Sequence, residues 1–379
     1  MNKTFKSLLS ICAALMLVIP AFAQVTTSSM SGHVSDVNGD SVPGVAVIAV
    51  HTQSGTQYYA VTNDQGQYNI NGMRAGGPYT VEFTCLGYQT VSYTDVTLKL
   101  AETYALDARM KDNAEMLLES IVISTASSKF ASEKTGAATN INNSQIVNLP
   151  TVSRSITDVT RLSPYGGNGM SFAGSDGRTA NFTVDGANFN NNFGLSDRLP
   201  GGGNPISIDA IEEMQVVISP YDLRQTGFVG GGVNAVTKSG TNTVKGSAYV
   251  YHRNENMRGD AIDREQIGGA RAKDQKTTWG FTLGAPIIKN KLFVFANLEF
   301  ENTPTIANRW KGSDNGVANS TQYISRTKNS DLQTVSDFVK QKYGYDTGSY
   351  TNFPADESNK KFLVRLDWNI NDKHHLAVR

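Results

Sequence analysis

Hydrophobic and polar residues alternate one by one in four runs of the C-terminal third of the chain. In one run, apolar residues at positions 279, 281, 283, 285 and 287 are separated by small or polar residues, and the same period recurs at residues 244–251, 292–301 and 361–370. A period of two places successive side chains on opposite faces of an extended strand. The pattern therefore predicts four long strands, each with an apolar face and a more polar face.

The lengths of these runs and of their connections distinguish two kinds of β protein. Each run has about 9 to 11 residues, which is enough to cross a bilayer when tilted, whereas strands of soluble sandwiches usually have about 5 to 6. A turn at residues 289–291 joins two of the runs, while long polar connections occupy residues 255–276 and 303–359. Short turns at one end and long loops at the other are typical of an outer-membrane barrel. We expect residues 243–379 to form part of such a barrel, with a soluble sandwich as the alternative.

The same alternation predicts which substitutions such strands tolerate. Leu298 belongs to the outward, lipid-facing set and Asn297 to the lumen-facing set, so we expect an arginine to be costly at position 298 and tolerated at position 297. Within the second long connection, Leu332, Val335 and Phe338 have helical spacing. They predict a short helix whose apolar face packs against its own loop.

The beginning of the chain has the pattern of a secretory signal peptide. Lys3 and Lys6 precede an apolar run at residues 8–20, and Ala-Phe-Ala at residues 21–23 matches a signal peptidase site. We therefore expect a signal peptide at residues 1–23, removed on export. No other apolar stretch reaches the roughly 18 residues that a membrane helix requires, so any crossing of a membrane is expected to use strands.

Short apolar runs separated by turn residues follow the expected cleavage site and predict a β-sandwich at residues 24–110. The turns contain Gly39 and Gly66, which we expect to have positive φ. The segments SGHVSDVNGDSVPGVAVIA, TNDQGQYNI and YTVEFTCLGYQT resemble the carboxypeptidase regulatory-like domain, a transthyretin-like sandwich found at the front of many Bacteroidetes outer-membrane receptors. Cys85 would be the single cysteine of the exported chain, and a buried thiol is its expected state.

Charge and residue types exclude several classes of function. The chain has 34 basic and 34 acidic residues, a balance that argues against a nucleic-acid surface. No set of nucleophile, base and orienting group is visible, so we expect no catalytic residue and no enzyme activity. Asp36, Asp40 and Asp64 have the spacing of turn residues rather than calcium ligands. The sequence thus predicts neither a metal site nor a cofactor.

A β-branched segment lies in the polar stretch that follows the sandwich, within an expected linker at residues 111–128. A short strand flanked by polar chain is suited to join the edge of another protein's sheet. The segment resembles the TonB box, which TonB captures by strand pairing. The alternative is the first strand of the following domain. The residues expected to contact TonB are Glu119, Ser120, Ile121, Val122, Ile123, Ser124 and Thr125.

Three further segments resemble the plug domain of TonB-dependent receptors, and we expect an α+β plug at residues 129–242. They are a V-D-G turn, an I-x-x-I-E-x-x-x-V pattern at residues 208–216 with helical character at its start, and the run GGVNAVTKSGTN at residues 231–242. The three glycines at 230–232 are expected to permit close packing of the plug against the barrel. A short helix is also expected near residues 156–162. The residues of the plug motif are Val184, Asp185, Gly186, Gly231, Gly232, Asn234, Lys238 and Gly240.

The resemblance extends over nearly all of the exported chain and implies a TonB-dependent outer-membrane receptor of the Bacteroidetes type. The segment TLGAPIIKNKLFVFANLEFE resembles the Oar-like branch of that family. The fold class expected is mainly β: a transthyretin-like β-sandwich, an α+β plug domain, then the first strands of an incomplete transmembrane β-barrel. Since family barrels have about 22 strands, the resemblance also implies an N-terminal fragment.

The function that the resemblance implies is energised uptake of a ligand through a plugged β-barrel in the cell outer membrane, with the N-terminal domains in the periplasm. Its implied partners are TonB of the TonB–ExbB–ExbD energy-coupling complex, outer-membrane lipid and a ligand that the sequence does not name, with no nucleic acid. The alternative is a non-transporting surface adhesin or assembly protein on the same scaffold.

Overall fold

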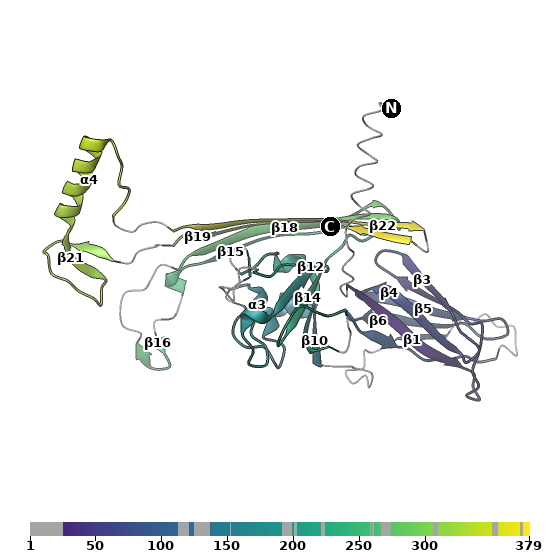
Figure 1. The fold of residues 1–379 in the computed structure, drawn as a ribbon. Coiled ribbons are helices and arrows are strands. Elements are labelled where there is room, and N and C mark those ends of the chain that lie inside the picture. Colours follow the sequence, from purple (N-terminus) through teal and green to yellow (C-terminus); the bar gives the residue numbers. More distant parts are fainter. Residues whose placement is uncertain are drawn as a thin grey trace, which may run out of the picture.

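The fold described is that of a computed structural model of the chain. Two compact β units lie side by side against a long, gently curved sheet (Figure 1). The expected signal peptide at residues 1–23 lies outside the described residues, and at residues 121–124 only the backbone is described. The structure describes residues 26–112, 121–124, 137–151, 153–191, 199–200, 203–220, 224–257, 259, 261–266, 274–305, 310–350, 355–371 and 374–379.

The first unit is a β-sandwich, as its turn spacing predicted. One sheet has the strand order β3-β2-β5-β6-β9, and the other has the order β4-β1-β7 with β8 also paired to β1. Alternate residues of the strands point into a shared core that includes Met30, Val47 and Phe83. The strands are β1 (Thr27–Ser35), β2 (Ala46–His51), β3 (Thr56–Val61), β4 (Gln67–Arg74), β5 (Gly76–Thr84), β6 (Val91–Leu98), β7 (Thr103–Ala105), β8 (Ala108–Arg109) and β9 (Ile121–Ser124).

The acidic turns of this unit have the chemistry that their spacing indicated. One carboxylate oxygen of Asp36 accepts hydrogen bonds from the backbone N–H groups of Asn38 and Asp40, at 2.8 and 2.9 Å. Gly39 and Gly66 have φ of 95° and 71°, the left-handed region that side chains disfavour. Cys85 is half-buried at the rim of the core, which corrects the expectation of a buried thiol.

The second unit is an α+β domain built on a mixed sheet with the strand order β10-β13-β14-β11-β12. Strands β14 and β11 are parallel, and the other neighbours are antiparallel. The strands are β10 (Ala137–Asn142), β11 (Asn181–Val184), β12 (Ala187–Asn188), β13 (Ile211–Ser219) and β14 (Gly232–Thr237), and the helices are α2 (Asn143–Asn148), α3 (Ile156–Thr160), η1 (Gly177–Thr179) and η2 (Ile208–Ala210).

Of two helices predicted in this unit, one is present as α3 and the other is only a 3₁₀ turn. The predicted helix near residues 156–162 is α3, which begins at a capping box formed by Ser155 and Asp158. The helical pattern expected from Ile208 to Ile211 is a single 3₁₀ turn, η2, because Ile211 already begins β13. Strand β13 is buried on both faces in its centre, so its apolar residues lack the two-residue alternation that identifies strands.

The long sheet has the order β15-β18-β19-β22-β23 with every neighbouring pair antiparallel. Side chains alternate as predicted: Phe281 and Leu283 are exposed, whereas the intervening Thr282 is buried. Three strands exceed the expected length, with 13, 12 and 15 residues in β18, β19 and β22. The strands are β15 (Lys245–Arg253), β18 (Lys276–Ile288), β19 (Leu292–Thr303), β22 (Glu357–Asn371) and β23 (His374–Val378).

The inner face of this sheet packs against the second unit, which corrects the substitution predicted to be tolerated. Asn297 is 1% exposed, and its amide nitrogen donates to the carbonyl of Phe281 at 3.3 Å. An arginine at this position would have to displace packed side chains, so it would be costly rather than tolerated. Position 298, on the other face, remains outward as predicted.

At lipid-facing positions of the sheet, the stability cost of a charged substitution is expected to depend on the depth of the position in the bilayer. Trp279 stacks on Phe300 with ring centroids 4.3 Å apart at one end of the apolar band, and Trp368 pairs with Leu292 at the other. Leu283 lies between these aromatic ends. We expect Leu283→Arg to reduce folding stability in bilayers by about 2–4 kcal/mol, because the charge lies near the bilayer midplane, and Ile287→Arg near the turn to cost about 1 kcal/mol or less. Equal costs in a urea titration of the protein in phospholipid would contradict this assignment.

The connections at the other end of the long sheet carry small elements of their own (Figure 1). Helix α4 contains the predicted helical segment and ends at Gly344, whose φ of 65° closes it. Leu332 is half-buried beside Gly312 of the same connection, whereas Val335 and Phe338 are 59% and 52% exposed, so the expected packing against the loop is present only in part. No helix in the described ranges is long and apolar enough to cross a membrane. These elements are η3 (Glu255–Met257), β16 (Ala261–Ile262), β17 (Glu265–Gln266), β20 (Lys311–Ser313), β21 (Ile324–Lys328) and α4 (Asn329–Tyr343).

Candidate functional site: the strand β9 and the contacts that hold the second unit

The segment singled out as a strand-pairing motif forms strand β9 on the first unit. Ile121, Val122, Ile123 and Ser124 run parallel to β6, in register with Val91, Ser92, Tyr93 and Thr94. This pairing corrects the alternative prediction, a first strand of the following domain, because β9 extends the sheet of the preceding one. Glu119, Ser120 and Thr125, the other predicted contacts, lie outside the described residues.

The first unit is also joined to the second by a short loop at residues 99–102. The backbone N–H of Leu100 donates to the Glu213 carboxylate at 3.0 Å, and its carbonyl accepts from the side-chain amide of Gln215 at 2.8 Å. Leu100 packs with Ala75 and Val236 in a small apolar cluster between the units. This loop therefore connects the first unit to strands β13 and β14.

Glu213 gives this junction a dependence on pH. It is 4% exposed, and burial raises the pKa of its carboxyl to about 8, against the opposing effect of the Leu100 N–H. The folded protein therefore holds a proton that the unfolded chain releases above about pH 4.5. This bound proton stabilises the folded protein fully below that pH, and its contribution to the free energy of unfolding is lost as the pH rises towards 8. Each unit of pKa shift corresponds to about 1.4 kcal/mol.

We expect Glu213→Gln to abolish this pH dependence, since glutamine keeps an acceptor for the Leu100 N–H and has no proton to lose. Hydrogen exchange of the Leu100 amide, followed from pH 5 to 8 after correction for intrinsic exchange, would show protection falling in the wild type and remaining flat in the variant. Glu82→Gln, at an exposed position, is the matched control and should behave as the wild type. Parallel profiles for wild type and Glu213→Gln would contradict the assignment.

A second junction links the first unit to the end of the long sheet that carries the short turns. The carbonyl of Gln53 accepts from the backbone N–H of Asn242 at 2.9 Å, and its side-chain oxygen accepts from the Lys245 ammonium at 3.2 Å. The Asn369 amide donates to Thr56 at 3.0 Å. The first unit therefore contacts both the second unit and the long sheet.

The predicted V-D-G turn lies where the second unit meets the long sheet. Asp185 and Gly186 both have positive φ, at 49° and 85°, which turns β11 back into β12. The Asp185 carboxylate accepts from the backbone N–H of Thr237 at 3.0 Å and lies 3.9 Å from Arg365 of β22. Arg379 reaches the other carboxylate oxygen at 3.5 Å. Asp185 thus joins β14 of its own unit to cations of the long sheet.

Arg365 is the centre of this contact, and no sequence pattern distinguished it from other lumen-facing charges. Its guanidinium forms a two-pronged pair with Asp367, with nitrogen–oxygen distances of 2.9 and 2.8 Å. A third nitrogen donates to the backbone carbonyl of Thr237 at 2.6 Å. Arg365 is 4% exposed, so these partners enclose a buried cation.

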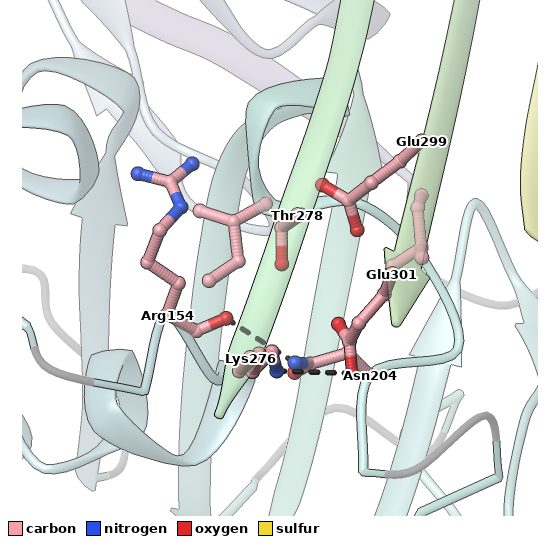
Figure 2. A pocket seen from close by; sticks show the side chains of 8 residues that line it. Arg154, Asn204, Lys276, Thr278, Glu299 and Glu301 are labelled. Atoms are coloured by element: carbon pink, nitrogen blue, oxygen red, sulfur yellow. Dashed lines mark hydrogen bonds and ion pairs between the residues drawn. The ribbon is translucent and has the colours of Figure 1, made fainter. Parts of the chain in front are cut away.

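A second polar contact lies on the inner face of β15, β19 and β22. The Glu299 carboxylate accepts from the hydroxyls of Ser207 and Tyr249, each at 2.8 Å, and pairs with the Lys361 ammonium at 2.9 Å. Figure 2 shows the small pocket beside it, where Arg154 and Asn204 of the second unit face strand residues of the sheet. Arg154 also ion-pairs with Asp209 and lies over the Tyr251 ring at 3.9 Å.

A polar cavity of about 380 Å³ lies where the three parts meet. Its lining includes His51 and Arg74 of the first unit, Lys238 of the plug motif and Lys245 of β15. Burial lowers the pKa of His51 to about 3 and also lowers the pKa of Lys238. The cavity therefore leaves polar space where the two units meet the sheet, next to Phe295, which lines the cavity and packs in the core of the second unit.

The glycines of the plug motif serve two different contacts. A Cβ at Gly231 would lie 2.7 Å from the Phe172 ring, and one at Gly232 would lie 2.8 Å from Phe228. Both neighbours belong to the second unit, which corrects the prediction that the glycine run packs against the barrel. Gly240 does so instead: a Cβ there would lie 2.5 Å from the carbonyl oxygen of Val294 in β19.

The remaining predicted residues have structural roles in the same unit. Val184 is buried in the core, and the side-chain oxygen of Asn234 accepts from the Thr183 hydroxyl at 2.8 Å. Lys238 donates its backbone N–H to Ala210 at 2.8 Å while its side chain borders the cavity. The structure thus brings Val184, Asp185, Gly186, Asn234 and Lys238 to one sheet, whereas β9 lies on the first unit.

Two families match parts of the chain. Residues 29–111 match the carboxypeptidase regulatory-like domain, and residues 236–309 match an outer membrane beta barrel domain. Both matches confirm modules that the sequence indicated. The match to the outer membrane beta barrel domain also supports the predicted location in the cell outer membrane.

A curated relative matches most of the chain. The TonB-dependent transporter Oar of Myxococcus xanthus is 25% identical over 391 residues, covering 97% of this chain and 34% of its own length. The chain therefore spans about a third of the relative that it matches. Together with the two domain matches, this similarity confirms the resemblance to TonB-dependent receptors that was stated from the sequence.

Solved structures with partial likeness include a receptor and a transporter. The siderophore receptor PirA of Acinetobacter baumannii has a TM-score of 0.38 at 20% identity, over 62% of this chain and 30% of its own. The outer membrane transporter YddB of Escherichia coli has a TM-score of 0.41 at 15% identity, over 62% and 31%.

Proposed function

We propose that the protein takes part in energised uptake of a ligand across the outer membrane, with TonB capturing the segment at residues 121–124. The observation that carries the proposal is the combination, in one chain, of a short backbone-pairing strand with a domain held against the inner face of barrel strands. Captured segments of this kind gain affinity from backbone hydrogen bonds, which β9 offers. In this proposal the first unit and the plug face the periplasm, where TonB and its partners ExbB and ExbD act.

The nature of the plug contacts supports gating. Phe295 and Leu363 of the long sheet pack against the apolar core of the plug. Asp185, Arg365 and Glu299 add hydrogen bonds and ion pairs that hold the plug. Water can replace such bonds, so each contributes only about 0.5–3 kcal/mol to stability. A pull on the N-terminal side can then rearrange the plug without unfolding the barrel strands.

We also propose the division of the chain on which this mechanism depends: a signal peptide at residues 1–23, the sandwich at 24–110, a linker at 111–128, the plug at 129–242 and barrel strands from 243 onward. The junctions at Leu100 and Gln53 support it, because they join the sandwich to the plug and to the barrel end.

The segment at residues 121–124 is tested by removing one backbone donor. We expect Val122→Pro to reduce capture by the immobilised C-terminal domain of TonB at least tenfold, because proline has no N–H for strand pairing. Val122→Ala keeps the donor and is the matched control, with capture unchanged. Equal capture of the proline variant and the wild type would show that TonB does not pair with this segment.

The same variant separates uptake from adhesion. Val335, Phe338 and Tyr343 of α4 expose apolar area at the end of the sheet that carries the long connections, which suits contact with a ligand or a neighbouring cell. In a transporter, Val122→Pro stops uptake and leaves surface binding intact. In an adhesin, it changes neither.

A further inference from the structure

We infer that the outer edge of β6 is a docking surface for residues 121–124, so that the first unit withholds this segment from TonB until it is released. The inference rests on the proposed function for its partner, and on the observed strand pairing for its geometry. It assigns to the regulatory-like sandwich a role as the resting site of the coupling segment.

Strand β6 is paired with a neighbouring strand on each side. Its inner neighbour is β5, and β9 occupies the other side over Val91, Ser92, Tyr93 and Thr94. Without β9, this stretch of β6 would be an exposed edge whose backbone groups are ready to pair with another chain. The segment at residues 121–124 satisfies those groups from within the same protein.

The edge is rigid because β6 is anchored in the core of the sandwich. Val91 is 1% exposed and Tyr93 is 9% exposed, and both belong to the core cluster. The hydroxyl of Tyr93 donates to the carbonyl of Asp107 at 3.1 Å, which ties β6 to the opposite layer. A preformed edge loses little conformational freedom when a strand docks.

The chain approaching β9 is held at the same edge. The backbone N–H of Gln89 donates to the carbonyl of Lys111 at 2.8 Å, and Tyr88 forms a bridge with Asp112. The segment is therefore tethered close to its docking site, and short tethers give effective concentrations on the order of millimolar. TonB must compete with this local concentration. Its apparent association constant for the segment is the intrinsic constant multiplied by the fraction of the segment that is undocked.

Docking limits capture because a strand directs about half of its backbone groups to each side. Strand β9 is the edge strand of its sheet, so its groups that face β6 are already paired and those on its outer side remain for a second partner. Pairing of TonB with the groups that face β6 therefore requires that β9 leave β6.

A reversible cross-link in the full chain tests both parts of the inference. Ser92 and Val122 are register partners. Cysteines at both positions, in a Cys85→Ser background and oxidised with diamide, should form a disulfide, because neighbouring strand residues lie within the distance that a disulfide spans. The matched control combines Ser92→Cys with Ser124→Cys, which is two residues out of register and shifted by about 7 Å along the strand.

We expect rapid cross-linking of the in-register pair only, at least tenfold weaker capture of the oxidised protein by the C-terminal domain of TonB, and full recovery after reduction with dithiothreitol. Equal cross-linking of the two pairs would overturn the docking. Unchanged capture after complete in-register cross-linking would overturn the withholding of the segment, because TonB would then bind β9 in place. If reduced wild-type protein shows no capture, the proposed function fails, while the cross-linking rates still decide whether β6 holds the segment.

Discussion

Replacing Arg365 with methionine is expected to weaken the attachment of the plug to the barrel strands by about 3–5 kcal/mol, the range found when one partner of a buried ion pair is removed. The guanidinium lies between Asp367 and the Thr237 carbonyl and faces Asp185 at 3.9 Å. Methionine fills a similar volume but leaves two carboxylates with less compensation. Through Arg365, β22 is hydrogen-bonded to the plug strand β14.

The effect should appear first in the plug strands. Hydrogen exchange measured by mass spectrometry on the membrane-embedded protein would show lost protection in β14 and β11. Arg326→Met is the matched control, because Arg326 is exposed in β21. Arg365→Lys should have an intermediate effect, since an ammonium keeps the charge and loses the two-pronged geometry. Unaltered protection in Arg365→Met would mean that other contacts hold the plug.

Adding a single methyl group at Gly240 is the second change with a large expected effect. A Cβ there would lie 2.5 Å from the Val294 carbonyl and 2.7 Å from the Ala285 carbonyl. Both contacts are with backbone atoms of hydrogen-bonded strands, which do not move aside as a side chain does. We expect Gly240→Ala to destabilise the protein by about 1–3 kcal/mol, the usual cost of overpacking.

Gly284→Ala is the matched control on the facing strand. A Cβ at Gly284 would have its nearest neighbours at 3.6 Å, an ordinary van der Waals contact. Urea denaturation of the two alanine variants in the same lipid should therefore shift the midpoint strongly for Gly240 and slightly for Gly284. Comparable midpoints would show that the junction between plug and barrel adapts to the added methyl group.

Features that depend on residues near in sequence were predictable. The alternation around Phe281 and Leu283 gave the strands and their faces, because the two-residue period is a local property of extended chain. The turn residues Asp36 and Gly66 predicted where the strands of the sandwich end, because turn geometry is also a local property of the chain. The recognisable motif at residues 184–186 also gave a turn, since positive φ at Asp185 and Gly186 is a local requirement.

Elements without a local pattern were missed or misjudged. Strand β1 has the sequence TSSMSGHVS, which is too polar to identify as a strand, and it is held by β4 and β7 from distant parts of the chain. The helical spacing at Ile208 and Ile211 was overridden because β13 is buried on both faces between β10 and β14. In each case tertiary packing outweighed local propensity.

By itself, the sequence determined the kind of protein: a mainly β chain with a regulatory-like sandwich, a plug motif and strands suited to the outer membrane. Only the tertiary structure decided which residues meet. It placed Arg365 against Asp185 and Thr237, joined Glu213 to Leu100, and set residues 121–124 on β6 rather than on the plug. The physical reason is that periodicity and turn chemistry act over a few neighbouring residues, whereas these contacts join positions far apart in the chain and exist only once the sheets have packed.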